Sequence, residues 1–188
     1  KTKRNNHKSD LSAKDGFTVV SIGWIMMALF SSLPYYITSN YNFTFVDSFF
    51  ESMSGLTTTG ASILGNEIKI EALSHGLLFW RSFTHFIGGM GIIVFSIAIL
   101  PLLGIGGVQL FRAEVAGPVA DKMTPRVKQT AKLLWGIYVG LVLILTIILY
   151  IQGMTLFDAL CHSFGTIATG GFSTHTSSIS FFNNPMIE

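Results

Sequence analysis

Two short stretches of threonine and glycine are the parts of this sequence best suited to bind an ion. They read TTTG at residues 57–60 and ATGG at residues 168–171. Threonine and glycine are poor helix formers, so each stretch interrupts the apolar sequence around it. An extended segment of this kind exposes a row of main-chain carbonyl oxygens, which glycine can turn to one side and which can replace the water shell of a monovalent cation. The candidate ion-binding residues are Thr57, Thr58, Thr59, Gly60, Ala168, Thr169, Gly170 and Gly171.

Each stretch follows a short apolar segment that begins with the pattern Thr-x-x-Asp. The pattern is formed by Thr44 with Asp47 and by Thr155 with Asp158, a spacing typical of a capped helix N-terminus. Each segment has about 12 residues, or roughly 18 Å of helix, which is too short to cross a hydrocarbon core of about 30 Å. We therefore predict two half-helices that are re-entrant or interfacial, the first ending at Gly55. Their partly negative C-terminal ends point at the Thr/Gly stretches and favour a cation there.

The two regions are copies of one unit at an offset of 111 residues. An internal repeat of this kind outranks other signals when a fold is predicted. A single Thr/Gly stretch is equally well explained as a turn at the membrane surface, whereas two copies in matched surroundings favour ion binding. The eight identical pairs are Trp24/Trp135, Ile37/Ile148, Thr44/Thr155, Asp47/Asp158, Ser52/Ser163, Thr58/Thr169, Gly60/Gly171 and Ser62/Ser173.

Composition places the chain in a membrane. Of its 188 residues, 49% are hydrophobic and 12% are charged, which is half the charged fraction of roughly 25% in soluble domains. Three apolar runs, 17–37, 72–103 and 127–151, are long enough to span a bilayer. The single cysteine, Cys161, excludes a disulfide within the chain, and the polar start KTKRNNHKSD is not a signal peptide. We expect the sequence to be part of a longer polypeptide.

Each unit consists of a span, a half-helix, a loop and a second span. Two crossings return the chain to its starting side, so the second unit has the orientation of the first. We therefore predict an all-α membrane protein of helix–pore-loop–helix repeats in a parallel, pseudo-symmetric arrangement. The expected division is a polar segment at 1–16, a first repeat at 17–103, a connector at 104–126 and a second repeat at 127–188, truncated after its loop.

The basic residues predict the orientation of these repeats. Five of the 12 lysines and arginines lie in residues 1–16 and five in residues 104–132. Lys69 alone lies in the loops around the half-helices, and Arg81 lies within a span. The positive-inside rule therefore places 1–16 and 104–132 in the cytoplasm, with the half-helices and their loops facing outward.

Three motifs, FFESMSGLTTTGAS, HFIGGMGIIV and HSFGTIATGGFSTH, resemble the first two pore repeats of the Trk/Ktr/HKT superfamily of potassium transporters. The bacterial Trk type is the most similar, and the resemblance covers the chain from about residue 17 onward. It implies four non-identical repeats around one ion path, of which this chain contains two. It also implies one filter glycine per repeat, here Gly60 and Gly171. A glycine rather than a serine at position 60 implies selectivity for potassium.

The same resemblance implies a function, a location and partners. The function is potassium uptake across a bacterial inner membrane through a filter of backbone carbonyls that faces the periplasm, with potassium as the substrate and no cofactor. The implied partners are the missing pore repeats of the same polypeptide, a second copy in a homodimer, and a cytoplasmic nucleotide-binding regulatory subunit. Two alternatives remain open: a membrane-embedded enzyme that uses His85, His162 or His175, and a structural bundle that conducts nothing.

Polar side chains near the loops are expected to support them. Arg81, as an ionisable residue inside a span, is expected to pair with an outer carboxylate or a loop carbonyl and to hold the half-helix in place. His85, one helical turn further on, is expected to be a hydrogen-bonded packing residue. Asp47 and Glu51 are expected to raise the cation concentration at the outer mouth. The expected supporting residues are Ser62, Ser173, Asp47, Asp158 and Arg81.

Other parts of the sequence have simpler explanations than a functional site. The glycines within residues 88–91 are expected to allow close helix packing rather than to form a hinge. Residues 103–114 are a connector or a contact for a regulatory partner. The sequence has no nucleophile elbow, P-loop or Rossmann fingerprint, so it is not expected to be an enzyme. Four other residues do not fit the spacing of a metal site: Asp158, Cys161, His162 and His175.

Overall fold

The computed structural model describes residues 13–38, 43–65, 68–99 and 123–187, and within these ranges its regular structure is helical. This confirms the predicted all-α class. The long helices are α1 (Ala13–Ile37), α3 (His75–Ile99) and α5 (Met123–Ile151), the half-helices are α2 (Phe45–Leu56) and α6 (Leu156–Ile167), and two 3-10 turns are η1 (Ile70–Ala72) and η3 (Ser178–Phe182).

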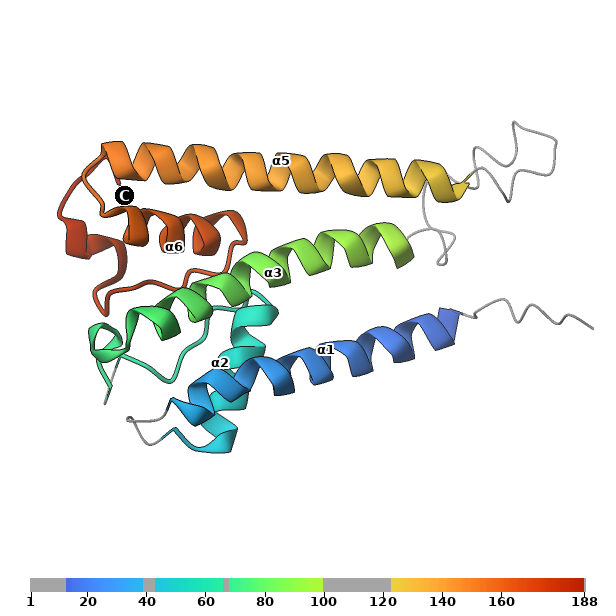
Figure 1. The fold of residues 1–188 in the computed structure, drawn as a ribbon, viewed down its shortest axis with the longest axis horizontal. Helices are drawn as coiled ribbons and strands as arrows, with labels where there is room; N and C mark the ends of the chain where they lie inside the picture. The colour runs from blue at the N-terminus through green and yellow to red at the C-terminus, as the bar shows by residue number, and fades with distance from the viewer. Residues whose placement is uncertain (1–12, 39–42, 66–67, 100–122, 188) are drawn as a thin grey trace, which may run out of the picture.

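The three long helices lie side by side, with α1 and α5 running in one direction and α3 in the other (Figure 1). The half-helices α2 and α6 lie toward the end of the bundle where α1 and α5 finish and α3 begins. Helix α2 packs between α1 and α3, while α6 packs between α5 and α3. The two repeats therefore share one orientation, and α3 is the element that both half-helices contact.

Both half-helices begin at the predicted threonine caps. The Thr44 hydroxyl accepts from the Asp47 N–H at 3.2 Å, and the Asp47 carboxylate accepts from the Thr44 N–H at 3.0 Å, forming a full capping box. The predicted stop at Gly55 is wrong, because α2 continues through it to Leu56. A Cβ on Gly55 would lie 2.0 Å from Thr84 Oγ1, so this glycine allows α3 to approach α2 instead of ending the helix.

The three long helices differ from the predicted apolar runs mainly at their N-terminal ends. Residues Phe17–Ile37 of α1 and Gln129–Ile151 of α5 are each long and apolar enough to cross a membrane. Most of their large apolar side chains are exposed, as expected for helices that face lipid or further helices. Helix α3 starts at His75 rather than at residue 72, because the preceding residues form η1 and an extended Leu73.

Close packing at glycine explains how α3 serves both repeats. A Cβ on Gly88 would lie 1.9 Å from the carbonyl oxygen of Leu56, at the end of α2. A Cβ on Gly89 would lie 2.6 Å from the Tyr138 hydroxyl of α5 and 3.1 Å from Ala168 Cβ. The expected packing role is confirmed for these two glycines, and α3 remains a continuous helix through them.

Parts of the predicted organisation lie outside the described residues. These are residues 1–12 of the polar segment, nearly all of the connector 104–126, and the whole motif at residues 103–114. The predicted domain boundaries therefore stay predictions.

Candidate ion-binding loops

The first loop (residues 57–62) and the second loop (residues 168–173) follow the same backbone path. Thr58 and Thr169, which are matched by the repeat, have φ angles of 53° and 59°. Gly60 and Gly171, also matched, have φ angles of 74° and 81°. Such angles are easy for glycine but unfavourable for a β-branched threonine, so the surrounding structure must hold them in place. Two unusual angles at the same two positions show that both copies impose one main-chain geometry.

Each loop bonds its N–H groups back to its own half-helix. The N–H groups of residues 57–59 donate to the last carbonyls of α2 at 2.9–3.1 Å, and those of residues 168–170 donate to the last carbonyls of α6 at 2.8–3.2 Å. Within the described ranges, no protein group donates to the carbonyl oxygens of residues 57–60. The half-helices thus satisfy the loop donors, and these acceptors stay available for another ligand.

The two loops meet at their glycines. A Cβ added to Gly60 would lie 1.7 Å from the carbonyl oxygen of Gly170. The main chain of the first loop therefore touches the main chain of the second, although 110 positions separate the two residues. The candidate ion-binding residues lie together and not on separate faces of the bundle.

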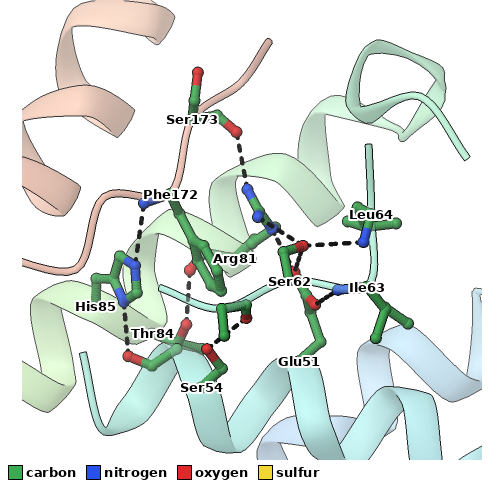
Figure 2. Close-up of polar contacts among 12 residues, drawn as sticks. Glu51, Ser54, Ser62, Ile63, Leu64, Arg81, Thr84, His85, Phe172 and Ser173 are labelled. Atoms are coloured by element: carbon green, nitrogen blue, oxygen red, sulfur yellow. Dashed lines mark hydrogen bonds and ion pairs between the residues drawn. The ribbon is translucent and has the colours of Figure 1, made fainter. Parts of the chain in front are cut away.

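A buried arginine joins the C-terminal ends of both loops (Figure 2). Arg81 Nε lies 2.7 Å from Glu51 Oε1, and the two side chains are 2% and 0% exposed. Arg81 Nη1 donates to the carbonyl oxygen of Ser173 at 2.9 Å, and Nη2 donates to Ser62 Oγ at 3.1 Å. The guanidinium also lies 3.6 Å from the centre of the Phe172 ring. One side chain of α3 thus contacts α2, the first loop and the second loop.

Glu51 is part of this network, and its predicted place at the outer mouth is wrong. Its Oε1 accepts from Ser62 Oγ at 2.8 Å, and its Oε2 accepts from the Ile63 N–H at 3.2 Å. With Arg81 beside it, the carboxylate has no free charge to offer a cation in solution. Removing either partner of a buried ion pair leaves an uncompensated charge, so the pair holds the first loop firmly.

The second loop is held by different side chains at matched positions. His162, which corresponds to Glu51, has Nε2 3.0 Å from Ser173 Oγ and Nδ1 2.8 Å from the carbonyl oxygen of Asp158. The Asp158 carboxylate accepts from Thr155 Oγ1 and from Thr174 Oγ1, each at 2.6 Å. Ser173 therefore has the contacts expected of a loop support, through its hydroxyl to His162.

His85 lies between the two repeats. Its Nδ1 is 2.7 Å from the carbonyl oxygen of Gly55, and its Nε2 accepts from the Phe172 N–H at 3.2 Å (Figure 2). The imidazole also stacks on the Phe172 ring with a centroid separation of 4.1 Å. The expected hydrogen-bonded packing role is confirmed, and the bonds reach the second loop as well as α2.

Polar contacts also connect the repeats near the start of α3. Glu71, in η1, accepts from the Thr176 N–H at 2.8 Å and from Thr176 Oγ1 at 2.6 Å. These hydrogen bonds lower the pKa of Glu71 to about 2. His175 lies between Glu71 and Asp158, with ring nitrogens 3.8 Å and 3.5 Å from their carboxylate oxygens. Across the described residues, no three His, Cys, Asp or Glu side chains are arranged to hold a metal.

Sequence reasoning finds the loops but misses several of their contacts. Phe172 carries no signal of its own in the sequence, although its N–H and ring contact His85 and its ring lies against Arg81. His162 is weighed there only as a metal ligand or enzyme residue. The repeat offset could have identified His162 as a loop support. It pairs His162 with Glu51 and Ser173 with Ser62, so the contact of Glu51 with Ser62 corresponds to that of His162 with Ser173.

The family model for TrkH, described as a cation transport protein, matches residues 1–188. The chain belongs to the TrkH family of cation transport proteins. It is 50% identical over 179 residues to the Trk system potassium uptake protein TrkH of Vibrio parahaemolyticus and 49% identical over 181 residues to TrkH of Escherichia coli K12. It is 45% identical over 180 residues to the Escherichia coli protein TrkG. These matches cover 95–96% of the chain but only 36–37% of the relatives.

A solved structure of the TrkH family has the same fold. The crystal structure of the potassium transporter TrkH from Vibrio parahaemolyticus aligns with a TM-score of 0.80 at 44% identity, covering 96% of this chain and 35% of that one. The predicted family and fold are confirmed, and the long apolar helices belong to a membrane protein. Because the family is one of transport proteins, the prediction that the chain is not an enzyme is also confirmed.

Proposed function

We propose that this chain supplies half of a potassium-conducting path, in which carbonyl oxygens of residues 57–60 and 168–171 replace the hydration shell of the ion. The observation that carries the proposal is the meeting of the two loops at Gly60 and Gly170, each loop having its N–H groups bonded to its own half-helix. Main-chain carbonyls of this kind select a cation by their number and spacing. The names of the relatives, which are potassium uptake proteins, support the same ion here.

The charges around the loops suit a monovalent cation. Helices α2 and α6 end at the loops, and the partly negative C-terminal end of a helix favours a cation. Arg81 lies close enough to oppose an ion, but Glu51 at 2.7 Å balances its charge. The ion therefore meets carbonyl oxygens next to an electrically balanced pair, which allows it to bind without being trapped by a bare carboxylate.

The rest of the ion path is proposed to come from the longer polypeptide. The chain spans about 36% of the length of its relatives, and two loops cannot surround an ion alone. In a ring of four repeats, Gly171 meets the next loop in the way that Gly60 meets Gly170. As in the family that the sequence resembles, two copies are proposed to form a homodimer with one path in each protomer.

The orientation and regulation follow from the same proposal. The loops face the periplasm of a bacterial inner membrane, because α1 and α5, which the basic segments precede in the sequence, begin at the opposite end of the bundle from the half-helices. A cytoplasmic nucleotide-binding subunit controls opening from the basic side. The family resemblance supports this partner, and the cytoplasmic connector is the segment that it would contact.

Substitution of Gly60 by serine tests the filter. The new side chain would occupy the position of the Gly170 carbonyl oxygen at a residue whose φ is 74°, so the second loop must move. In the full-length protein in proteoliposomes, we expect the potassium-to-sodium permeability ratio to fall about tenfold, equivalent to about 1.4 kcal/mol of differential ion binding.

The matched control is Gly76→Ser. Gly76 lies in the first turn of α3, has ordinary backbone angles, and has nothing within 4 Å of an added Cβ. It should leave the ratio unchanged. An unaltered ratio in Gly60→Ser with normal flux would contradict the filter, and an absence of potassium flux in the unsubstituted protein would favour the structural bundle instead.

A further inference from the structure

The contacts of His85 determine which of its nitrogens carries the proton. A carbonyl oxygen only accepts hydrogen bonds and an amide N–H only donates them. Nδ1 must therefore carry a proton for the Gly55 carbonyl, while Nε2 must offer its lone pair to the Phe172 N–H. The ring is therefore a neutral imidazole with a hydrogen bond at each nitrogen. These two bonds connect the second loop to the C-terminal turn of α2. Figure 2 shows the contact between the ring and Phe172.

The same ring presses on Gly170. A Cβ at Gly170 would lie 2.4 Å from Nε2 and 2.5 Å from Cδ2 and Cε1 of His85. Gly170 does not have a positive φ, unlike Gly60 and Gly171. The backbone therefore does not require a glycine at position 170, and His85 excludes every larger residue. The matched position in the first loop holds Thr59, whose hydroxyl is free to contact Thr57 at 2.7 Å.

We propose that His85 is a positioning residue that sets the ion preference of the second loop. The proposal rests on the proposed function, since it assigns the preference to the carbonyls of that loop. His85 restrains the loop by a hydrogen bond at Phe172 and by direct contact at Gly170. Arg81 holds the end of the loop at Ser173, so of these two α3 side chains His85 is the one that contacts an ion-binding residue, Gly170.

The physical reason is the spacing of the carbonyl oxygens. A cage that discriminates potassium from sodium must resist shrinking around the smaller ion, whether by its size or by the number of oxygens that it presents. A loop released from His85 can move its carbonyls inward and bind sodium better. Loss of the ring should therefore change selectivity more than it changes the total flux of cations.

A size exchange between positions 85 and 170 tests this role in the full-length protein. In proteoliposomes, His85→Ala and Gly170→Ala should each lower the potassium-to-sodium permeability ratio, by about tenfold for Gly170→Ala, which equals about 1.4 kcal/mol. The double variant should recover most of the ratio lost in Gly170→Ala, because the added methyl group enters space that the ring has left. His85→Gln, whose amide can both donate and accept, should keep a ratio near that of the unsubstituted protein.

The controls separate this inference from the function on which it rests. His75→Ala removes an exposed histidine from the first turn of the same helix and should leave the ratio unchanged. If Gly60→Ser changes the ratio while Gly170→Ala does not, the role of His85 is overturned and the filter stands. If neither changes it, the proposed function fails. If His85→Ala does not assemble, the test uses Gly170→Ala and the double variant Gly170→Ala with His85→Gly. A higher potassium-to-sodium permeability ratio in the double variant than in Gly170→Ala supports the role of His85, and an equal ratio contradicts it.

Discussion

The two loops share a main-chain geometry but are held by different side chains. Matched residues have matched positive φ angles, and matched N–H groups donate to matched carbonyls of the preceding half-helix. The supports differ: the first loop uses the carboxylate of Glu51, balanced by Arg81, whereas the second uses the imidazole of His162. The difference shows that two chemically unrelated side chains can support the same backbone path, which is the feature that the proposed filter requires.

The largest expected effect is a difference in stability between variants of the two supporting residues, Glu51 and His162. Glu51→Gln leaves Arg81 buried without its counter-ion, which should cost about 3–5 kcal/mol of unfolding free energy. His162→Gln loses at most one or two neutral hydrogen bonds and should cost about 1–2 kcal/mol. Thermal unfolding of the full-length protein in detergent measures both. Similar losses for the two variants would show that the ion pair is not the stronger support.

The control for this comparison removes both charges together. Glu51→Leu with Arg81→Leu replaces the pair by apolar side chains, which is often tolerated where a single removal is not. The double variant should therefore be more stable than Glu51→Gln alone, although Ser173 loses its contact with Arg81.

A smaller effect is expected at the two capping aspartates. Asp158 accepts from Thr155 and from Thr174 and is 9% exposed, whereas Asp47 serves only the exposed cap at Thr44. Asp158→Asn should cost about 2–3 kcal/mol, because charged acceptors make the stronger hydrogen bonds. Asp47→Asn should cost about 0.3–1 kcal/mol, the usual value of a negative charge at a helix N-terminus. Equal changes in the unfolding temperature of the two variants would show that the hydrogen bond between Asp158 and Thr174 adds no stability.

The smallest effect concerns the contact that links the repeats at the surface. The pKa of Glu71 falls to about 2 in the folded protein, from an ordinary value of 4.5, because Thr176 donates two hydrogen bonds to its carboxylate. A lowered pKa means that the contact is fully stabilising above about pH 4.5 and is lost as the pH falls toward 2. Amide exchange at Thr176, corrected for its intrinsic rate, should quicken over that interval.

Glu71→Gln provides the comparison for the pH experiment. The variant has no carboxylate to titrate, so its exchange at Thr176 should be fast and should show no step between pH 4.5 and 2. A step of the same size in the variant would assign the pH dependence to another group, such as Asp158 beside His175.

Local sequence patterns predict the local structure, but they do not predict the long-range contacts. The caps at Thr44 and Thr155 depend on an aspartate three residues away, so the sequence contains the whole signal. The repeat offset is by itself enough to locate both loops. By contrast, Glu51 pairs with Arg81 across 30 positions, and His85 reaches Phe172 across 87. Such partners are chosen by the packing of α3 against both half-helices, which periodicity does not encode.

The error at Glu51 illustrates this limit. Its position in the chain places it on the half-helix before the first loop, but does not tell whether its side chain faces water or the interior. Only the burial of Arg81 on the neighbouring helix decides that question, because a buried guanidinium needs a buried carboxylate. The prediction at Gly55 is wrong for a similar reason, since the demand for a glycine comes from Thr84 on another helix.

The sequence positions of the Arg81 partners have a consequence for biosynthesis. Ser173 follows Arg81 by 92 residues, whereas Glu51 precedes it by 30. At roughly 5–20 residues per second, translation delivers the second loop roughly 5–20 s after the arginine. An unpaired arginine within a membrane span is costly, and Glu51, which is synthesised first, can offset that cost. Both partners of the ion pair therefore belong to the first repeat, so their charges can pair before the second loop is synthesised.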